Sequence, residues 1–195
     1  MSRWPLAALF FAATVQADAR FDSAYQRGQD LFYLGKYAEA RTAFEKARSL
    51  APKLPGPHRW LGRVARVLES WEDCVASATE AVRLRPDSPL VPQVREDLDA
   101  CRAALGRPGY GKKLAAGQGA LAIIVDAAAA DTGARIIVDG IDRGTAPVAP
   151  FPLNAGRHRV RLRRGKDSVE ADVVVVPGIV ADAVLQLLTP ASPKR

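Results

Sequence analysis

The stretch that decides the fold of the first half of the chain is Gly28–Pro52, GQDLFYLGKYAEARTAFEKARSLAP, because its key positions return 34 residues later. Three pairs of identical residues stand in this one register: Gly28 and Gly62, Ala47 and Ala81, Pro52 and Pro86. Self-similarity at a fixed period indicates a repeat architecture. Glycine and alanine let two helices approach closely, and proline ends a helix because it cannot continue the hydrogen-bond ladder. We therefore predict two consecutive helical hairpins.

The period, and the segment Gly35–Ala40 (GKYAEA) between the two helices of the first copy, resemble the tetratricopeptide repeat. The resemblance runs from Phe21 to Asp87 and implies a domain that binds a protein or peptide. Within the second copy, Glu69 replaces the turn glycine and Ala78 replaces the large aromatic residue. We therefore expect the second repeat to be the less stable one.

One more amphipathic helix is predicted over 89–105, because Leu90, Val94, Leu98 and Cys101 fall on one helical face. It would cap the two repeats, which gives an all-α domain over 20–105. Cys74 lies early in the helix before it and Cys101 lies late in the cap, so adjacent antiparallel helices would bring the two together. A disulfide across this 27-residue loop would stabilise the domain by roughly 3–4 kcal/mol. The alternative is a pair of buried free thiols.

The first 19 residues have the pattern of a secretory signal peptide. Arg3 supplies the positive charge, Trp4–Val15 is an apolar run too short to span a bilayer, and a small-x-small cleavage site ends at Ala19. We expect cleavage after Ala17 or Ala19, a periplasmic or secreted protein and no transmembrane span after cleavage. The alternative is an uncleaved anchor or a buried helix.

Residues 106–119 hold five glycines and no Val, Ile or Phe, which is typical of a linker. The segment Gly106–Lys113 is close to the phosphate-loop pattern, but Lys113 stands where a Ser or Thr hydroxyl should bind magnesium. The segment also follows a predicted helix rather than a strand. We therefore do not predict a nucleotide site here.

Hydrophobic residues alternate with period two over 120–188, for example at Ile179, Ala181, Ala183, Leu185 and Leu187. Turn signals such as Asp139-Gly140 and Pro177-Gly178 separate the runs, so we predict a small all-β antiparallel sandwich, followed by a disordered tail at 189–195. The elements Val138-Asp139-Gly140, Gly144-Thr145-Ala146-Pro147 and Leu153–Val160 resemble the PEGA domain, although 131–134 read Asp-Thr-Gly-Ala. That resemblance implies a non-catalytic module of bacterial envelope and surface proteins.

Two predicted surfaces carry the functional hypotheses. The first is a peptide-binding face on the first helix of each repeat, made of Tyr25, Gln29, Phe32, Arg59, Arg63 and Arg66. Guanidinium groups form bidentate hydrogen bonds with carboxylates, so we expect this face to bind an acidic or C-terminal peptide. The alternative is a solvated face neutralised by Glu69 and Asp97.

The second predicted surface is a basic sheet face that would attract anionic envelope polymer, made of Arg157, Arg159, Arg161 and Arg163. The alternative there is cross-strand pairing with Glu170 and Asp172.

The net charge of +7 and the pI of about 9.8 do not predict a nucleic-acid partner for an exported protein. Two histidines and two cysteines are too few for the common zinc frameworks. His58 and His158 read as packing or turn residues, and Asp139 and Asp142 lack the spacing of a calcium loop. We expect no enzyme, no cofactor and no metal. The sequence predicts a non-enzymatic, protein-binding adaptor or scaffold of the bacterial envelope; the alternative is a binder of anionic envelope polymer.

Overall fold

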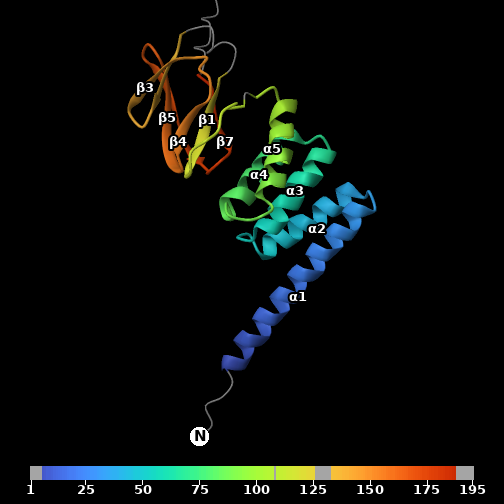
Figure 1. Cartoon of the computed structure of the whole chain (residues 1–195). Coiled ribbons are helices and arrows are strands. Elements are labelled where there is room, and N and C mark those ends of the chain that lie inside the picture. The colour runs from blue at the N-terminus through green and yellow to red at the C-terminus, as the bar shows by residue number, and fades with distance from the viewer. Residues whose placement is uncertain (1–5, 108, 126–132, 188–195) are drawn as a thin grey trace, which may run out of the picture. The chain divides into compact units, whose positions relative to one another are not determined.

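The computed structural model describes residues 6–107, 109–125 and 133–187, which belong to two compact units divided between Leu105 and Gly106. The predicted order, helices followed by strands, is confirmed (Figure 1). Several predicted features lie outside the described residues: the tail at 189–195, the first five residues of the signal peptide, and positions 131 and 132.

Five helices make up the described part of the first unit: α1 (Leu6–Tyr33), α2 (Tyr37–Leu50), α3 (Pro55–Val67), α4 (Trp71–Leu84) and α5 (Val91–Ala104). Helix α1 packs on α2, α3 packs on α4, and α5 packs on both α4 and α3. The unit is therefore two helical hairpins and a fifth helix that covers the second hairpin (Figure 1).

Helix α1 is continuous from Leu6, so the peptide bonds after Ala17 and Ala19, where we predict cleavage, lie within this helix in the full chain. No helix in the part of the chain that the structure describes is both long and apolar enough to cross a membrane.

The two hairpin turns use the same backbone conformation with different residues. Gly35, after α1, has φ +75°, and Glu69, after α3, has φ +57°. Glycine adopts positive φ without a steric penalty, whereas a residue with a Cβ atom does not. Glu69, which replaces the turn glycine in the second repeat, therefore has a strained backbone conformation in the second turn.

The two repeats differ most in how closely their helices approach. Gly28 of α1 lies against the ring of Phe44, which is completely buried and stacks on Trp60 with ring centroids 5.4 Å apart. In the second repeat, Gly62 of α3 lies against the backbone and side chain of Ala78. The first hairpin therefore has an aromatic core where the second has a methyl group.

The second unit contains seven described strands: β1 (Gln118–Val125), β2 (Arg135–Val138), β3 (Ile141–Thr145), β4 (Phe151–Asn154), β5 (Gly156–Arg164), β6 (Asp167–Val175) and β7 (Val180–Leu185). They form a three-stranded sheet in the order β4-β1-β7 and a four-stranded sheet in the order β3-β2-β5-β6. Buried residues of both sheets, among them Leu121, Leu185, Ile136 and Leu162, form one core. The predicted sandwich is confirmed.

One strand pair differs from the antiparallel prediction. β1 runs parallel to β7, with Leu121 opposite Ala181 and Ile123 opposite Ala183, while every other described pair is antiparallel. Strand β1 is the central strand of its sheet and is buried from Gly119 to Ile123 without alternation. A near-continuous apolar run is typical of a strand covered on both faces.

The start of the predicted linker is tied to the strand unit. Arg107 Nη1 lies 2.9 Å from Asp182 Oδ2 of β7, and both side chains are largely buried. A guanidinium and a carboxylate this close and this shielded hold the backbone near Arg107 to the three-stranded sheet.

Candidate functional site

The predicted peptide-binding residues of α1 and α3 face each other through a layer of aromatic rings. Phe32 of α1 contacts Trp60 of α3 edge-on, with centroids 5.2 Å apart. The Trp60 indole N–H donates a 3.0 Å hydrogen bond to the Tyr25 hydroxyl oxygen. Gln29 is half-buried between them on α1. We call the surface formed by Tyr25, Gln29, Phe32, Arg59 and Arg63 the α1–α3 face.

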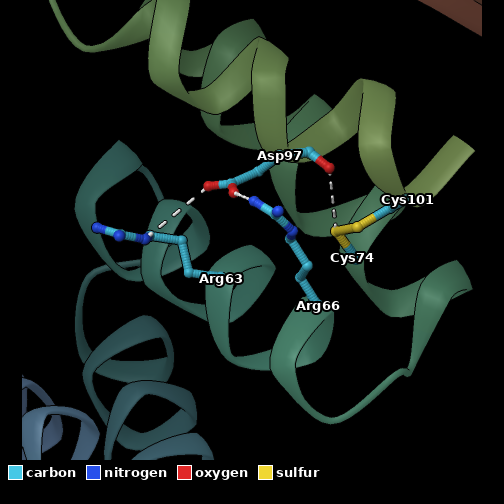
Figure 2. Close-up of a disulfide and its surroundings, with 5 residues drawn as sticks. All are labelled: Arg63, Arg66, Cys74, Asp97 and Cys101. Carbon is cyan, nitrogen blue, oxygen red and sulfur yellow. Dashed lines mark hydrogen bonds and ion pairs between the residues drawn. A yellow bond between two sulfur atoms is a disulfide. The ribbon is translucent and has the colours of Figure 1, made fainter.

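Two of the three predicted arginines converge on one carboxylate of α5 (Figure 2). Arg66 Nη1 lies 2.5 Å from Asp97 Oδ1, and Arg63 Nε lies 3.9 Å from Asp97 Oδ2. The Asp97 side chain is only 14% exposed, whereas the Arg66 side chain is 48% exposed, so the pair is shielded from solvent on the carboxylate side only. Asp97 therefore neutralises Arg66 through a close ion pair and Arg63 only through a longer contact. The predicted alternative, internal neutralisation by Asp97, applies to these two arginines and not to Arg59.

A covalent bond fixes α5 on the same face of the helix, one turn further along. The structure joins Cys74 of α4 to Cys101 of α5 in a disulfide, and Figure 2 shows the bridge beside the backbone of Asp97. The Cys74 sulfur lies 3.8 Å from the Asp97 carbonyl oxygen; because a bridged sulfur has no proton to donate, this is a packing contact. The disulfide and the ion pairs of Asp97 together hold α5 against α3 and α4.

Arg59 differs from the other two arginines. Its guanidinium lies over the Trp60 ring, 4.9 Å from the centroid, and no carboxylate of the described residues is within ion-pair distance. Together with Arg85 it lines a small cavity of about 40 Å³ whose walls are mainly apolar side chains such as Leu90 and Val94. Arg85 likewise has no ion-pair partner in the described part of the chain. This place therefore offers two guanidinium groups to an incoming anion.

Arg63 contacts the same aromatic layer as Arg59. Its guanidinium lies 5.2 Å from the Trp60 centroid and 5.6 Å from the Phe32 centroid, in addition to its long contact with Asp97. A cation held over aromatic faces is stabilised by about 0.5–1 kcal/mol per contact at exposed sites. The aromatic layer therefore positions positive charge on the α1–α3 face.

Three of the four arginines of the predicted basic sheet face lie within ion-pair distance of a carboxylate on the neighbouring strand. The four arginines of β5 all point to the exposed side, as alternation predicts. Register places Arg159 opposite Asp172 and Arg161 opposite Glu170. Arg159 Nε lies 3.3 Å from Asp172 Oδ1, Arg157 Nη1 lies 3.8 Å from Asp172 Oδ2, and Arg161 pairs closely with Glu170. Arg163 donates a hydrogen bond to the Gly165 carbonyl oxygen. Cross-strand pairing therefore accounts for Arg157, Arg159 and Arg161 but not for Arg163.

A histidine–aspartate pair in the strand unit was not predicted. His158 Nδ1 lies 2.6 Å from Asp139 Oδ2, and its Nε2 lies 2.8 Å from the Asn154 carbonyl oxygen. The second Asp139 oxygen accepts the Arg159 backbone N–H at 2.9 Å. The sequence marks Asp139-Gly140 as a turn, but nothing in it shows that this turn lies beside His158.

The protonation of this pair follows from its surroundings. The hydrogen bond from His158, aided by the Arg159 backbone N–H, lowers the pKa of Asp139 below its ordinary 3.8. Burial acts to lower the pKa of His158, but its hydrogen bonds to Asp139 and Asn154 together outweigh burial and raise that pKa above 6.5. Both ring nitrogens face acceptors, so the charged imidazolium, which donates twice, fits this place best.

The remaining single-residue candidates have structural surroundings. His58 is buried on α3, and its Nε2 lies 3.0 Å from the Pro52 carbonyl oxygen. Asp142 pairs with Arg135 at 3.0 Å and accepts the Gly144 backbone N–H. Across the described ranges, no three His, Cys, Asp or Glu side chains cluster closely enough to hold a metal ion.

Comparison with known proteins agrees with the geometry of the first hairpin. A family model described as the tetratricopeptide repeat matches residues 21–54, which cover the end of α1, all of α2 and the turn after it. No curated protein matches the chain. The match shows a tetratricopeptide repeat in the first hairpin, and the second hairpin has the same arrangement 34 residues later.

Proposed function

We propose that this chain is a non-enzymatic adaptor of the bacterial cell envelope whose helical unit binds an acidic or C-terminal peptide of a partner protein. Tetratricopeptide repeats generally mediate protein–protein interaction. The observation that carries the proposal is Arg59, a guanidinium held over Trp60 with no carboxylate partner among the described residues, next to Arg85 and a cavity with apolar walls. A peptide carboxylate would complete its charge.

The binding site is the α1–α3 face extended to Arg85. A carboxylate would pair with Arg59 and Arg85, and the apolar residues before it would lie on Phe32 and Tyr25. Arg66 takes no part, because Asp97 already holds its guanidinium at 2.5 Å. Asp97 limits the affinity for acidic peptides, since its negative charge lies next to Arg63.

The test measures fluorescence anisotropy of labelled peptides that end in a free carboxylate, each against the same peptide with a C-terminal amide. Arg59→Gln should weaken binding of the free-acid peptides, because a hydrogen bond to a charged group contributes about 1.5–3 kcal/mol. Arg48→Gln is the matched control, because it removes one exposed charge of the same unit from α2. Asp97→Asn should strengthen binding.

Two results would contradict the proposal: equal affinities for acid and amide peptides, or an Arg59→Gln variant that binds like Arg48→Gln. Loss of binding in Asp97→Asn with an unchanged unfolding midpoint would also contradict it, since that would make the carboxylate part of the site rather than its competitor.

The envelope location is a separate part of the proposal. It is supported by the apolar run after Arg3 and by the Cys74–Cys101 disulfide, because disulfides form and persist outside the reducing cytosol. The resemblance of the strand unit to the PEGA domain adds to it. Mass spectrometry of the protein from a periplasmic extract should find an N-terminus at Asp18 or Arg20 and a bridged cysteine pair. A full-length cytosolic chain with free thiols would refute it.

A further inference from the structure

A second hollow of the helical unit lies away from the α1–α3 face, between α1 and α2. This N-terminal groove has a volume of about 570 Å³. Its floor is formed by Ala24 and Ala43, which are 6% and 8% exposed. Its rim carries the side chains of Arg20, Arg27 and Lys46. None of the residues of the α1–α3 face lines it.

The groove is the place of a missing helical neighbour. In stacked repeats each hairpin buries one face against the hairpin before it and one against the hairpin after it. Here α2 packs on α3, and α5 covers the second hairpin. On the opposite side of the first hairpin, no other described helix covers the groove, and Ala24 and Ala43, themselves mostly buried, form its deepest part. Alanines at such a floor let another helix approach closely, because they leave room for its backbone and side chains.

The charge of the rim identifies the chemistry of the occupant. No carboxylate of the described residues lies within ion-pair distance of Arg20, Arg27 or Lys46. Glu39, the one acid among the described residues that line the groove, lies 3.7 Å from Lys36 Nζ. The described part of the rim therefore carries an excess of positive charge. A second copy of this chain fits the groove poorly as an occupant. In a symmetric contact, Arg20, Arg27 and Lys46 of one copy would face the same three cations of the other copy and repel them.

We propose that the N-terminal groove binds an acidic amphipathic helix of a partner protein. The small or apolar side of that helix would lie on Ala24 and Ala43. Its Glu or Asp residues, spaced three or four apart to share one face, would reach Arg20, Arg27 and Lys46. This site takes a folded helix along its side, whereas the α1–α3 face takes the end of a peptide.

The test is a selection of displayed helical peptides on the purified chain, with counter-selection on the variant Arg20→Gln/Arg27→Gln/Lys46→Gln. All three side chains are exposed, so the variant should keep the circular dichroism and unfolding midpoint of the wild type. The enriched peptides should carry Glu or Asp at helical spacing beside an apolar stripe. The most enriched peptide, labelled with fluorescein, should lose about tenfold or more in affinity on the triple variant.

Three controls separate this site from the proposed function. Arg59→Gln should bind the selected peptide as the wild type does, and Arg48→Gln on α2 should do the same. A version of the peptide with Gln for every Glu should bind as weakly as the acidic peptide binds the triple variant. Failure of Arg59→Gln to alter free-acid peptide binding would affect the α1–α3 face alone.

The inference is overturned if the selection yields no peptide, if the enriched peptides are not acidic, or if the triple variant binds the selected peptide with unchanged affinity. It is also overturned if sedimentation shows a dimer of the wild type that the triple variant loses, because the occupant would then be a second copy.

Discussion

Replacing Gly28 with alanine should destabilise the first repeat, although alanine is the better helix former. An ideal Cβ at this position would lie 2.6, 2.7 and 2.8 Å from three carbons of the Phe44 ring. Carbon atoms in contact normally stand about 3.5–4.0 Å apart, so the overlap is about 1 Å. The ring has little room to move, because it is fully buried, stacks on Trp60 at 5.4 Å and meets Tyr25 edge-on at 5.9 Å.

The magnitude follows from two opposing contributions. Overpacking of a well-filled core costs about 1–3 kcal/mol, and alanine recovers about 1 kcal/mol of helix propensity over glycine. Because the new Cβ would overlap three ring carbons at once, we place the overpacking cost in the upper part of that range, about 2–3 kcal/mol, and expect a net loss of about 1–2 kcal/mol for Gly28→Ala. The matched change is Gly62→Ala in the second repeat, where the nearest atoms are Ala78 N at 3.4 Å and Ala78 Cβ at 3.5 Å. That change should be neutral or stabilise by up to about 1 kcal/mol.

Urea unfolding of the full chain, followed by far-ultraviolet circular dichroism, measures both variants. The helical signal reports on the first unit, because the described part of the second unit contains strands and no helix. A double variant, Gly28→Ala with Phe44→Leu, tests the contact itself: alanine should cost less when the ring is absent. Gly28→Ala with wild-type or greater stability, or equal effects at Gly28 and Gly62, would refute the reasoning.

Three further changes test other parts of the structure. Glu69→Gly should raise the unfolding free energy by about 0.5–1 kcal/mol in the same urea assay, because glycine relieves the positive φ of this turn. Reduction of the Cys74–Cys101 disulfide, whose cysteines are 27 residues apart, should lower the unfolding free energy by roughly 3–4 kcal/mol, which the urea midpoint reports. An unchanged midpoint would show that the disulfide does not constrain the unfolded chain. The pair of His158 and Asp139 should make the strand unit most stable between about pH 4 and 6.5 in thermal unfolding. The raised pKa of His158 contributes stability that is complete below pH 6.5 and is lost as the pH rises through the pKa of the folded state. The lowered pKa of Asp139 contributes stability that is lost as the pH falls through the pKa of that carboxyl in the folded state. His158→Gln should remove the loss of stability at alkaline pH.

The arrangement of each unit could be predicted from local spacing. Gly28 and Gly62, or Ala47 and Ala81, report a repeat because every copy of a hairpin needs small residues at the same contact. Alternation at Ile179–Leu187 indicates a strand with one buried face, and the structure buries those alternate positions. Both signals depend on residues close together along the chain.

The parallel pairing of β1 with β7 could not be predicted in this way. Alternation identifies a strand but carries no information on the direction of its partner. The sequence did hold a signal, since Ala120–Val125 is a run of six apolar residues, and such a run favours a central strand covered on both faces over the half-exposed strand that alternation suggested.

Which of the three arginines of α3 form ion pairs could not be predicted from the sequence, because it depends on tertiary structure. Spacing correctly places Arg59, Arg63 and Arg66 on one helix, and Asp97 is an evident candidate partner. Which arginine Asp97 reaches depends on the rotation and tilt of α5 against α3, set by the packing of Leu98 and Val94 and by the disulfide. The sequence therefore left open which guanidinium stays available for a ligand.

The parallel neighbours β1 and β7 have a mechanical consequence. They are the first and last described strands of the unit, and six residue pairs from Ala120–Val180 to Val125–Leu185 join the two. Tension applied between Gln118 and Leu185 would pull these strands past each other, so their hydrogen bonds would bear the load together in shear and would not open one after another. A module tethered at both ends in this way resists stretching.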